Sequence, residues 1–330
     1  MSLSIGIVGL PNVGKSTLFN ALTKKSVPCE NYPFCTIDPS VGVVAVPDDR
    51  LWQLSEFSKS AKTIPAVIEF VDIAGLVAGA SKGEGLGNKF LSNIREVDAI
   101  VHVVRTFQDN SIIHVANKVD PTQDISVINL ELILADMETV SKRIINLNKD
   151  VKRGDKDAIL EDSILNKIIK VLEEGKVATE ANVSEDEKFK IKSLNLLTFK
   201  PMLYVLNVSE ASENTEVGLP NVLSVKVDPV FEKGFDDLIK KSYELLGLET
   251  FFTTGEDESR AWTIKKGSTA PIAGTAIHTD FRDKFIRAEV INWKDLLEAG
   301  SYGEARSKGK VRIEGKEYIV KDGDVIEFRI

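Results

Sequence analysis

Residues 9–16 read Gly-Leu-Pro-Asn-Val-Gly-Lys-Ser and fit the spacing G-x-x-x-x-G-K-[ST] at every fixed position. An apolar run at 5–8 leads into this loop and an apolar-periodic stretch at 17–22 leads out of it, which is the strand, loop and helix context of a phosphate-binding loop. The glycines let successive backbone N–H groups turn toward one anion, and the new helix adds its positive N-terminal end. Lys15 is placed to reach the β- and γ-phosphates of a nucleotide, and the Ser16 hydroxyl to hold Mg²⁺.

Two further sequence elements restrict the kind of ligand that this loop can bind. Asp72-Ile73-Ala74-Gly75 follows the apolar run 67–71 and has the form D-x-x-G, with a carboxylate that can organise Mg²⁺ through water and a glycine N–H that can meet the γ-phosphate. Asp-x-x-Gly turns are common, but this one stands at a strand end about sixty residues after a phosphate loop. Thr36, between the first helix and the next strand, is expected to complete the Mg²⁺ coordination rather than to serve only as a turn hydroxyl.

The element that reads the base has two candidates. Asn117-Lys118-Val119-Asp120 matches the guanine-reading pattern N-K-x-D, but only a short link separates it from the expected strand 99–105. A crossover to a parallel neighbour needs about a dozen residues, so we interpret 117–120 as a surface turn. Asn207-Val208-Ser209-Glu210 directly follows the expected strand 202–206, which is the right place for a base-reading segment.

The residues of this second candidate do not suit guanine. A carboxylate accepts hydrogen bonds from guanine N1–H, but it has no proton to give to adenine N1, and Glu210 is one methylene longer than the aspartate of N-K-x-D. Backbone groups around Val208 can serve adenine instead. The sequence therefore predicts a weakened preference for guanine without proving that ATP is the ligand.

The residue that orients the attacking water is not obvious. Many small GTPases carry a glutamine after D-x-x-G, whereas this chain has Leu76, which can neither donate nor accept a hydrogen bond. Of the three histidines, His102 lies inside an expected strand and is predicted to pack in the core, and His278 lies far away in the C-terminal part. His114 follows the fourth strand at the edge where such folds bind ligands, so we expect it to position the water, although a loop histidine is often only a surface residue.

The pattern along the chain indicates an α/β fold with an insertion. Apolar runs alternate with helical patterns over 1–120, which is typical of a mostly parallel sheet. From about Asp124 a heptad stripe begins, and a second stripe follows a break at Gly154-Asp155, so we expect a coiled-coil hairpin. Ser184 and Glu187 form a capping-box pattern that predicts another helix through Leu197. Expected strands are 4–9, 42–47, 67–72, 99–105 and 202–206, and in a small C-terminal α+β module 261–264, 310–313, 318–320 and 325–329.

Composition limits the remaining possibilities. The chain has 330 residues and a net charge of −8, but residues 260–330 hold 14 Lys/Arg against 11 Asp/Glu, so that any RNA contact is expected there. Cys29, Cys35 and three histidines provide neither a disulfide framework nor a zinc site. No apolar stretch approaches the roughly 18 residues of a membrane span, and the N-terminus runs directly into the first strand. We expect a cytoplasmic protein without a membrane partner.

These motifs together resemble the Obg-like ATPase family, YchF subfamily. The resemblance covers nearly the whole chain and rests on the phosphate loop, on the segments N-Y-P-F-C-T-I-D-P and F-V-D-I-A-G-L-V, on N-x-x-E at 207–210, and on the C-terminal R-A-W-T-I, I-H-T-D-F and Y-I-V-K-D-G-D-V. It implies a P-loop NTPase domain with a coiled-coil helical insertion and a C-terminal ubiquitin-like (β-grasp) TGS domain. The implied boundaries are 1–123 and 201–247 for the NTPase domain, 124–200 for the insertion and 248–330 for the TGS domain.

The resemblance also implies an activity and site residues. It implies Mg²⁺-dependent hydrolysis of ATP in preference to GTP by a ribosome-associated switch protein, with RNA as a further partner through the TGS domain. The residues implied to bind the nucleotide are Asn12, Val13, Gly14, Lys15, Ser16, Thr17, Asn207, Val208 and Glu210, with Ser16 and Thr36 on Mg²⁺. Lys15, Asp72, Gly75 and His114 would act in hydrolysis. Asn12 suggests K⁺ as a second cation.

One departure and two alternatives stay open. Between Asn207 and Leu248 the chain looks shorter than the family pattern, and the S-A-x motif that supports the base is hard to find; Leu223–Val227 is the segment that would stand in its place. A GTPase of the same superfamily is the first alternative. A nucleotide-regulated scaffold on the ribosome or on RNA, with little turnover, is the second.

Overall fold

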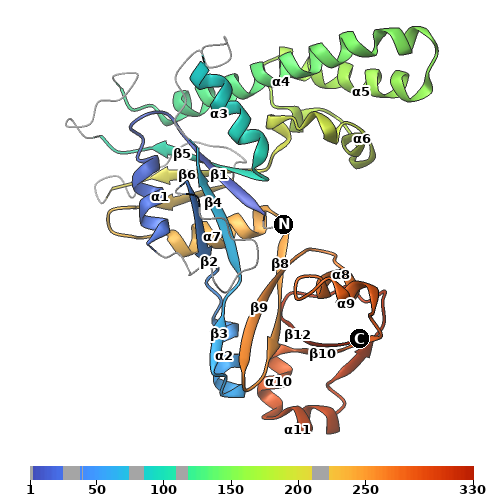
Figure 1. Cartoon of the computed structure of the whole chain (residues 1–330). Helices are drawn as coiled ribbons and strands as arrows, with labels where there is room; N and C mark the ends of the chain where they lie inside the picture. The colour runs from blue at the N-terminus through green and yellow to red at the C-terminus, as the bar shows by residue number, and fades with distance from the viewer. Residues whose placement is uncertain (1–2, 25–37, 39, 74–84, 109–117, 210–222) are drawn as a thin grey trace.

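The computed structural model describes residues 3–24, 38, 40–73, 85–108, 118–209 and 223–330. Its strands form two six-stranded sheets, and a long helical arm projects beyond the first sheet, at the top of Figure 1. The second sheet lies at the opposite end of the molecule. Within the described ranges, no helix has the length and apolar character of a membrane span.

The first sheet has the strand order β2-β4-β1-β5-β6-β7, and every neighbouring pair is parallel except β2 and β4. The predicted strands are confirmed to within two residues. Every residue of β5 is buried, because a parallel strand is covered on both faces. The strands are β1 Ser4–Val8, β2 Val41–Ala45, β4 Val67–Asp72, β5 Ala99–Arg105, β6 Met202–Asn207 and β7 Ser224–Val227, and the helices of this part are α1 Lys15–Thr23, α3 Gly85–Glu96 and α7 Phe235–Leu245.

The helical arm confirms the predicted hairpin. The apolar stripe of α4 (Pro121–Lys152) packs against that of α5 (Lys156–Glu173), and Gly154 turns the chain between them with a positive φ. Arg143 and Glu161 hold the two helices together through hydrogen bonds of 2.7 and 2.8 Å. Asp120 caps the start of α4 by accepting the Gln123 N–H, so its carboxylate is used inside the chain.

The helix predicted through Leu197 is wrong in its length. The capping box of Ser184 and Glu187 does open a helix, but α6 ends at Lys190 and 3-10 turns follow at Lys192–Leu194 and Leu197–Phe199. The buried Asp136 carboxylate of α4 accepts the backbone N–H groups of Leu197 and Thr198 at 2.8 Å each. These backbone groups therefore bond to a distant side chain instead of continuing a helix, which no local pattern shows.

The second sheet has the order β11-β10-β12-β8-β9-β3 and includes a strand from far upstream, β3. The predicted strand 318–320 is wrong, because Ile319 makes only an isolated bridge to Thr269. The predicted 261–264 and 325–329 lie inside observed strands, and 310–313 is shifted to 312–314. The strands are β3 Lys62–Ile64, β8 Leu248–Thr254, β9 Glu258–Lys265, β10 Arg287–Asn292, β11 Arg312–Glu314 and β12 Asp324–Arg329, and the helices are α2 Asp49–Ser58, α8 Ala270–Gly274, α9 Asp280–Asp283, α10 Trp293–Ala299 and α11 Tyr302–Ser307.

Candidate functional site

The glycine loop lies between β1 and α1, as its sequence predicts. Gly14 precedes the first residue of α1 with φ +92°, and Leu18 donates to the Gly14 carbonyl at 2.9 Å to close the first helical turn. A Cβ on Gly9 would stand 2.8 Å from the Val103 carbonyl oxygen. Both fixed glycines are therefore required by the backbone, one for its left-handed conformation and one for close approach to β5.

Lys15 and Asp72 meet beside this loop. The Lys15 ammonium lies 2.8 Å from an Asp72 carboxylate oxygen, although 57 residues separate them in the chain. The pairing of β1 with β4 explains the contact, because Ile7 at the end of β1 lies opposite Asp72. The phosphate-loop lysine and the D-x-x-G aspartate are thus brought to one point at the carboxyl edge of the sheet.

Asn207 reaches the same loop from β6. Its side-chain amide donates to the Val13 carbonyl at 2.8 Å, and only 4 % of the residue is exposed. A Cβ on Gly14 would stand 2.2 Å from that amide nitrogen, so Asn207 occupies the space that a side chain at this position would need. Two of the predicted nucleotide-binding segments, which lie about two hundred residues apart, are in direct contact.

Sequence reasoning missed Thr106. Its N–H and its hydroxyl both donate to the Asn207 carbonyl, at 3.1 and 2.8 Å, and so fix the backbone from which the Asn207 amide projects. The available signal was its position immediately after the buried strand β5, at the edge where the site was expected. Val208 follows with its side chain buried and its N–H bonded to the Val227 carbonyl at 3.0 Å.

The remaining predicted residues divide into two groups. Asn12, Ser16 and Thr17 are exposed on the loop and on the first turn of α1. The other predictions lie outside the described residues: Thr36, Gly75, His114 and Glu210. His102 is fully buried in β5, as expected for a core residue, and burial lowers its pKa to about 3.

The oxygen donors at the loop suit a hard cation. The Ser16 hydroxyl makes no hydrogen bond to another described residue, and the Asp72 carboxylate lies at the end of β4 on the same sheet edge. Among the described residues, no group of three or more His, Cys, Asp or Glu side chains could hold a metal by itself. The Ser16 hydroxyl and the Asp72 carboxylate are oxygen donors of the kind that Mg²⁺ takes, one or two at a time, together with waters and substrate phosphates.

Comparison with known proteins extends the similarity to the whole chain. The family described as "50S ribosome-binding GTPase" matches residues 4–149, and YchF-GTPase_C, described as a protein of unknown function, matches 248–330. The "Ribosome-binding ATPase YchF" of Bacillus subtilis is 53 % identical over 363 aligned positions, which cover 100 % of this chain and 99 % of that protein. The protein of the same name from Haemophilus influenzae is 48 % identical over 100 % of this chain and 99 % of its own length.

A solved structure agrees. The Schizosaccharomyces pombe protein described as a YchF GTPase superposes with a TM-score of 0.87 at 39 % identity, covering 99 % of this chain and 98 % of that one. The Bacillus subtilis alignment is longer than the 330 residues of this chain, so the relative carries residues that this chain lacks. With such similarity in sequence and in fold along its full length, the chain belongs to the YchF family.

Proposed function

We propose that this protein hydrolyses ATP in a Mg²⁺-dependent reaction and acts at the ribosome. The observation that carries the proposal is the glycine loop at which Lys15, Asp72 and Asn207 converge from three different strands or helices. The names of the relatives, ribosome-binding ATPase, support both the nucleotide and the partner. The C-terminal module, with its excess of basic residues, is the part proposed to meet RNA.

The proposed role of each residue in binding the phosphates and Mg²⁺ follows from its position. Backbone N–H groups of 12–17 and the N-terminal end of α1 would hold the phosphates. Lys15 would leave Asp72 for the β- and γ-phosphates, and Ser16 together with Thr36 would hold Mg²⁺. When bound, Mg²⁺ supplies charge neutralisation on the phosphate oxygens. Asp72 would organise the metal through water, and Gly75 would donate its N–H to the γ-phosphate.

Two further roles in ATP turnover are proposed from the sequence, one for His114 and one for K⁺. His114 would orient the attacking water, since Leu76 cannot, and K⁺ beside Asn12 would add positive charge. Replacing His114 with Ala should lower ATP turnover and leave ATP binding intact, and unchanged turnover would remove His114 from the mechanism. Equal ATP turnover in Na⁺ and in K⁺ would exclude the proposed role of K⁺.

The preference for adenine is proposed from what the base-side residues can offer. The Asn207 amide is engaged by the Val13 carbonyl, and the Val208 side chain is buried, so this segment presents mainly backbone groups. The Val208 N–H is already bonded to the Val227 carbonyl, and the Asn207 carbonyl accepts from Thr106. The backbone from the Val208 carbonyl onward would therefore pair with adenine N1 and N6, with Glu210 next in the chain. A GTPase is the second candidate, because the Schizosaccharomyces pombe relative is described as one.

The test is calorimetry of the purified chain with ATP and with GTP in the presence of Mg²⁺, followed by release of phosphate. The variant Lys15→Ala should lose triphosphate affinity, whereas Lys24→Ala, whose side chain is 72 % exposed just beyond α1, should bind as the natural chain does. Absence of binding to both triphosphates would overturn the proposal. Tighter binding of GTP would favour the second candidate, and ribosome co-sedimentation tests the partner.

A further inference from the structure

One segment of the chain is shared between the two sheets. Residues 46–66, here called the crossing segment, leave the first sheet after β2 and return to it at β4. Between these strands the chain forms α2 and then β3, and β3 belongs to the second sheet: it pairs in parallel with β9, with Lys62 opposite Glu258 and Ile64 opposite Arg260. Figure 1 shows this excursion in blue at the lower left, beside the orange and red strands of the C-terminal module.

Polar and apolar contacts fix the crossing segment to the C-terminal module. The Ser60 hydroxyl donates to the Gly255 carbonyl at 2.6 Å and lies 2.7 Å from the Ser259 hydroxyl. Leu51 and Leu54 of α2 are buried in one continuous core that also contains Phe252 and Ala261, and residues of the first sheet belong to the same core. The crossing segment is therefore packed and hydrogen-bonded against the C-terminal module as well as joined to the first sheet.

The other ends of β2 and β4 lie at the nucleotide site. The two strands pair antiparallel from Val41 opposite Val71 to Ala45 opposite Val67, and the Asp72 N–H donates to the Ser40 carbonyl at 2.8 Å. Asp72 also holds Lys15. At about 3.3 Å per residue, this two-stranded ribbon spans about 20 Å from the phosphate loop to the crossing segment.

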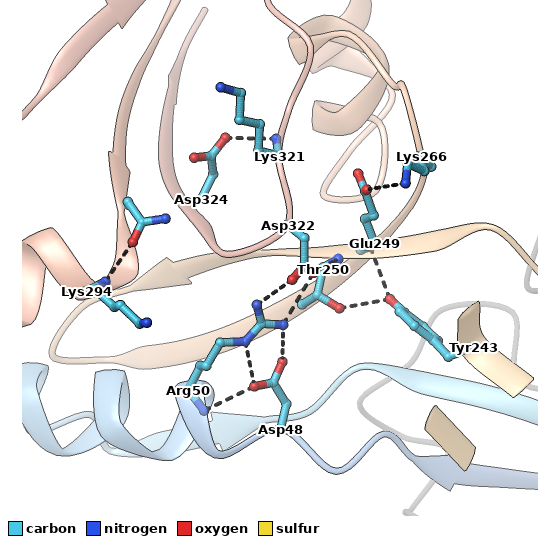
Figure 2. Close-up of polar contacts among 11 residues, drawn as sticks. Asp48, Arg50, Tyr243, Glu249, Thr250, Lys266, Lys294, Lys321, Asp322 and Asp324 are labelled. Atoms are coloured by element: carbon cyan, nitrogen blue, oxygen red, sulfur yellow. Dashed lines mark hydrogen bonds and ion pairs between the residues drawn. The ribbon is translucent and has the colours of Figure 1, made fainter. Parts of the chain in front are cut away.

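Arg50 joins the crossing segment to the last turn of the C-terminal module (Figure 2). Its guanidinium donates to both carboxylate oxygens of Asp48, at 2.8 and 2.7 Å, and to those of Asp322, at 2.5 and 3.3 Å. Asp322 also accepts the Thr250 N–H of β8 at 3.0 Å. Burial works to lower the pKa of Arg50, but the hydrogen bonds that Arg50 donates to Asp48 and Asp322 outweigh it and raise that pKa, so Arg50 keeps its charge.

The junction beside Arg50 is not packed solid. A cavity of about 590 Å³ separates the start of α2 from the end of α7 and the start of β8, and Lys240, Tyr243 and Glu249 line it together with Asp48, Arg50 and Asp322. The cavity thus lies where the chain passes between the sheets, both at 46–50 and at 247–250. The ion pair of Arg50 with Asp322 lies in the wall of this open pocket.

We propose that the crossing segment couples the triphosphate site to the C-terminal module, and that the Arg50–Asp322 ion pair is the latch that sets this coupling. The inference rests on the proposed binding of a triphosphate. A bound triphosphate takes Lys15 away from Asp72, which changes the interactions at the end of β4. The paired strands β2 and β4 carry that change to α2 and β3, because hydrogen-bonded and close-packed elements transmit displacement. By linkage, a change at the latch alters nucleotide affinity in return.

The test uses the full chain and a non-hydrolysable ATP analogue with Mg²⁺. Hydrogen exchange followed by mass spectrometry should show changed protection in peptides covering 49–64 and 320–325 on binding. The variants Arg50→Gln and Asp322→Asn should change the affinity for the analogue by about 5-fold or more, as typical coupling energies predict. The matched control is Arg306→Gln, because Arg306 also contacts two carboxylates, Glu289 and Glu327, but only within the C-terminal module; its affinity should stay within about 2-fold.

The outcomes are separable. If the natural chain binds no triphosphate, the proposed function fails and the coupling with it. If the natural chain binds but both latch variants match Arg306→Gln in affinity, or exchange in 49–64 does not respond to the analogue, only the coupling is overturned. Asp322→Asn decides the matter should Arg50→Gln not fold, since the Asp322 side chain is 46 % exposed and asparagine retains an acceptor for the Thr250 N–H.

Discussion

His102 makes the stability of the first sheet depend on pH. It lies in β5 between Val8 of β1 and Tyr204 of β6 and is fully buried, and neither ring nitrogen has a hydrogen-bond partner among the described residues. Burial lowers its pKa from 6.5 to about 3, so the folded chain keeps the ring neutral at every pH at which the protein is handled. Replacing it with Phe removes the titrating group and keeps a planar ring in the same space.

The expected size of the effect follows from linkage. The unfolded chain takes up a proton on His102 as the pH falls through about 6.5, and the folded chain does not until about 3. The free energy of unfolding therefore falls as the pH is lowered, because the unfolded state binds more protons. Between pH 7.5 and 5.5 this one residue contributes a loss of about 1.4 kcal/mol.

The assay is urea unfolding followed by circular dichroism at pH 7.5 and at pH 5.5. The natural chain should lose about 1.4 kcal/mol more than His102→Phe over this interval. The control is His278→Gln, because the His278 side chain is 65 % exposed and its ring is already in water in the folded chain. Equal pH dependence of the natural chain and His102→Phe would refute the reasoning, since a buried neutral ring must become protonated on unfolding.

Three further predictions concern the nucleotide site and the arm. Gly14→Ala should abolish triphosphate binding in calorimetry, because a Cβ there meets the Asn207 amide at 2.2 Å and φ is +92°; unchanged affinity would contradict this. Asn207→Leu should weaken triphosphate binding by roughly 5- to 150-fold, because it removes the buried hydrogen bond to the Val13 carbonyl, which is worth about 1–3 kcal/mol. A change in affinity below 2-fold would show that the loop does not need this hydrogen bond. Asp136→Ala leaves the Leu197 and Thr198 N–H groups unpaired and should speed proteolysis at 191–200; equal cleavage rates would disprove that anchoring role.

The features predicted best from the sequence are those whose physical cause is local. β5 was predicted correctly because it is mostly apolar, with five of its seven residues Ala, Ile or Val, as expected for a central parallel strand that is buried on both faces. Helix α4 was predicted correctly because Ile133, Val140 and Leu147 recur every seven residues and so lie on one face of the helix. The phosphate loop is also predicted from local spacing, since Gly14 has a positive φ where α1 begins, although the close approach of Gly9 to Val103 depends on the fold.

The features that sequence reasoning missed depend on partners far along the chain. The backbone at 197–198, where the helix was predicted to continue, is held instead by the Asp136 carboxylate of another helix, which accepts the N–H groups of Leu197 and Thr198. Strand β3 has only three residues, and it is a strand because β9, almost two hundred residues later, offers a free edge beside it. No pattern within Lys62–Ile64 points to that neighbour.

The position of Asn207 shows why the site was still partly predictable. β6 pairs with β5 in parallel register, with Ile100 opposite Met202, and this pairing is independent of the helical arm between the two strands. Because β6 lies beside β5 in parallel, its last residue, Asn207, reaches the phosphate loop whatever the length of the insertion. A motif could therefore be assigned from its place after a buried strand, whereas its contact with Val13 and its support from Thr106 required the fold. The same reasoning places the more closely matching N-K-x-D segment elsewhere: it comes before the arm rather than after β6, and its Asp120 caps α4.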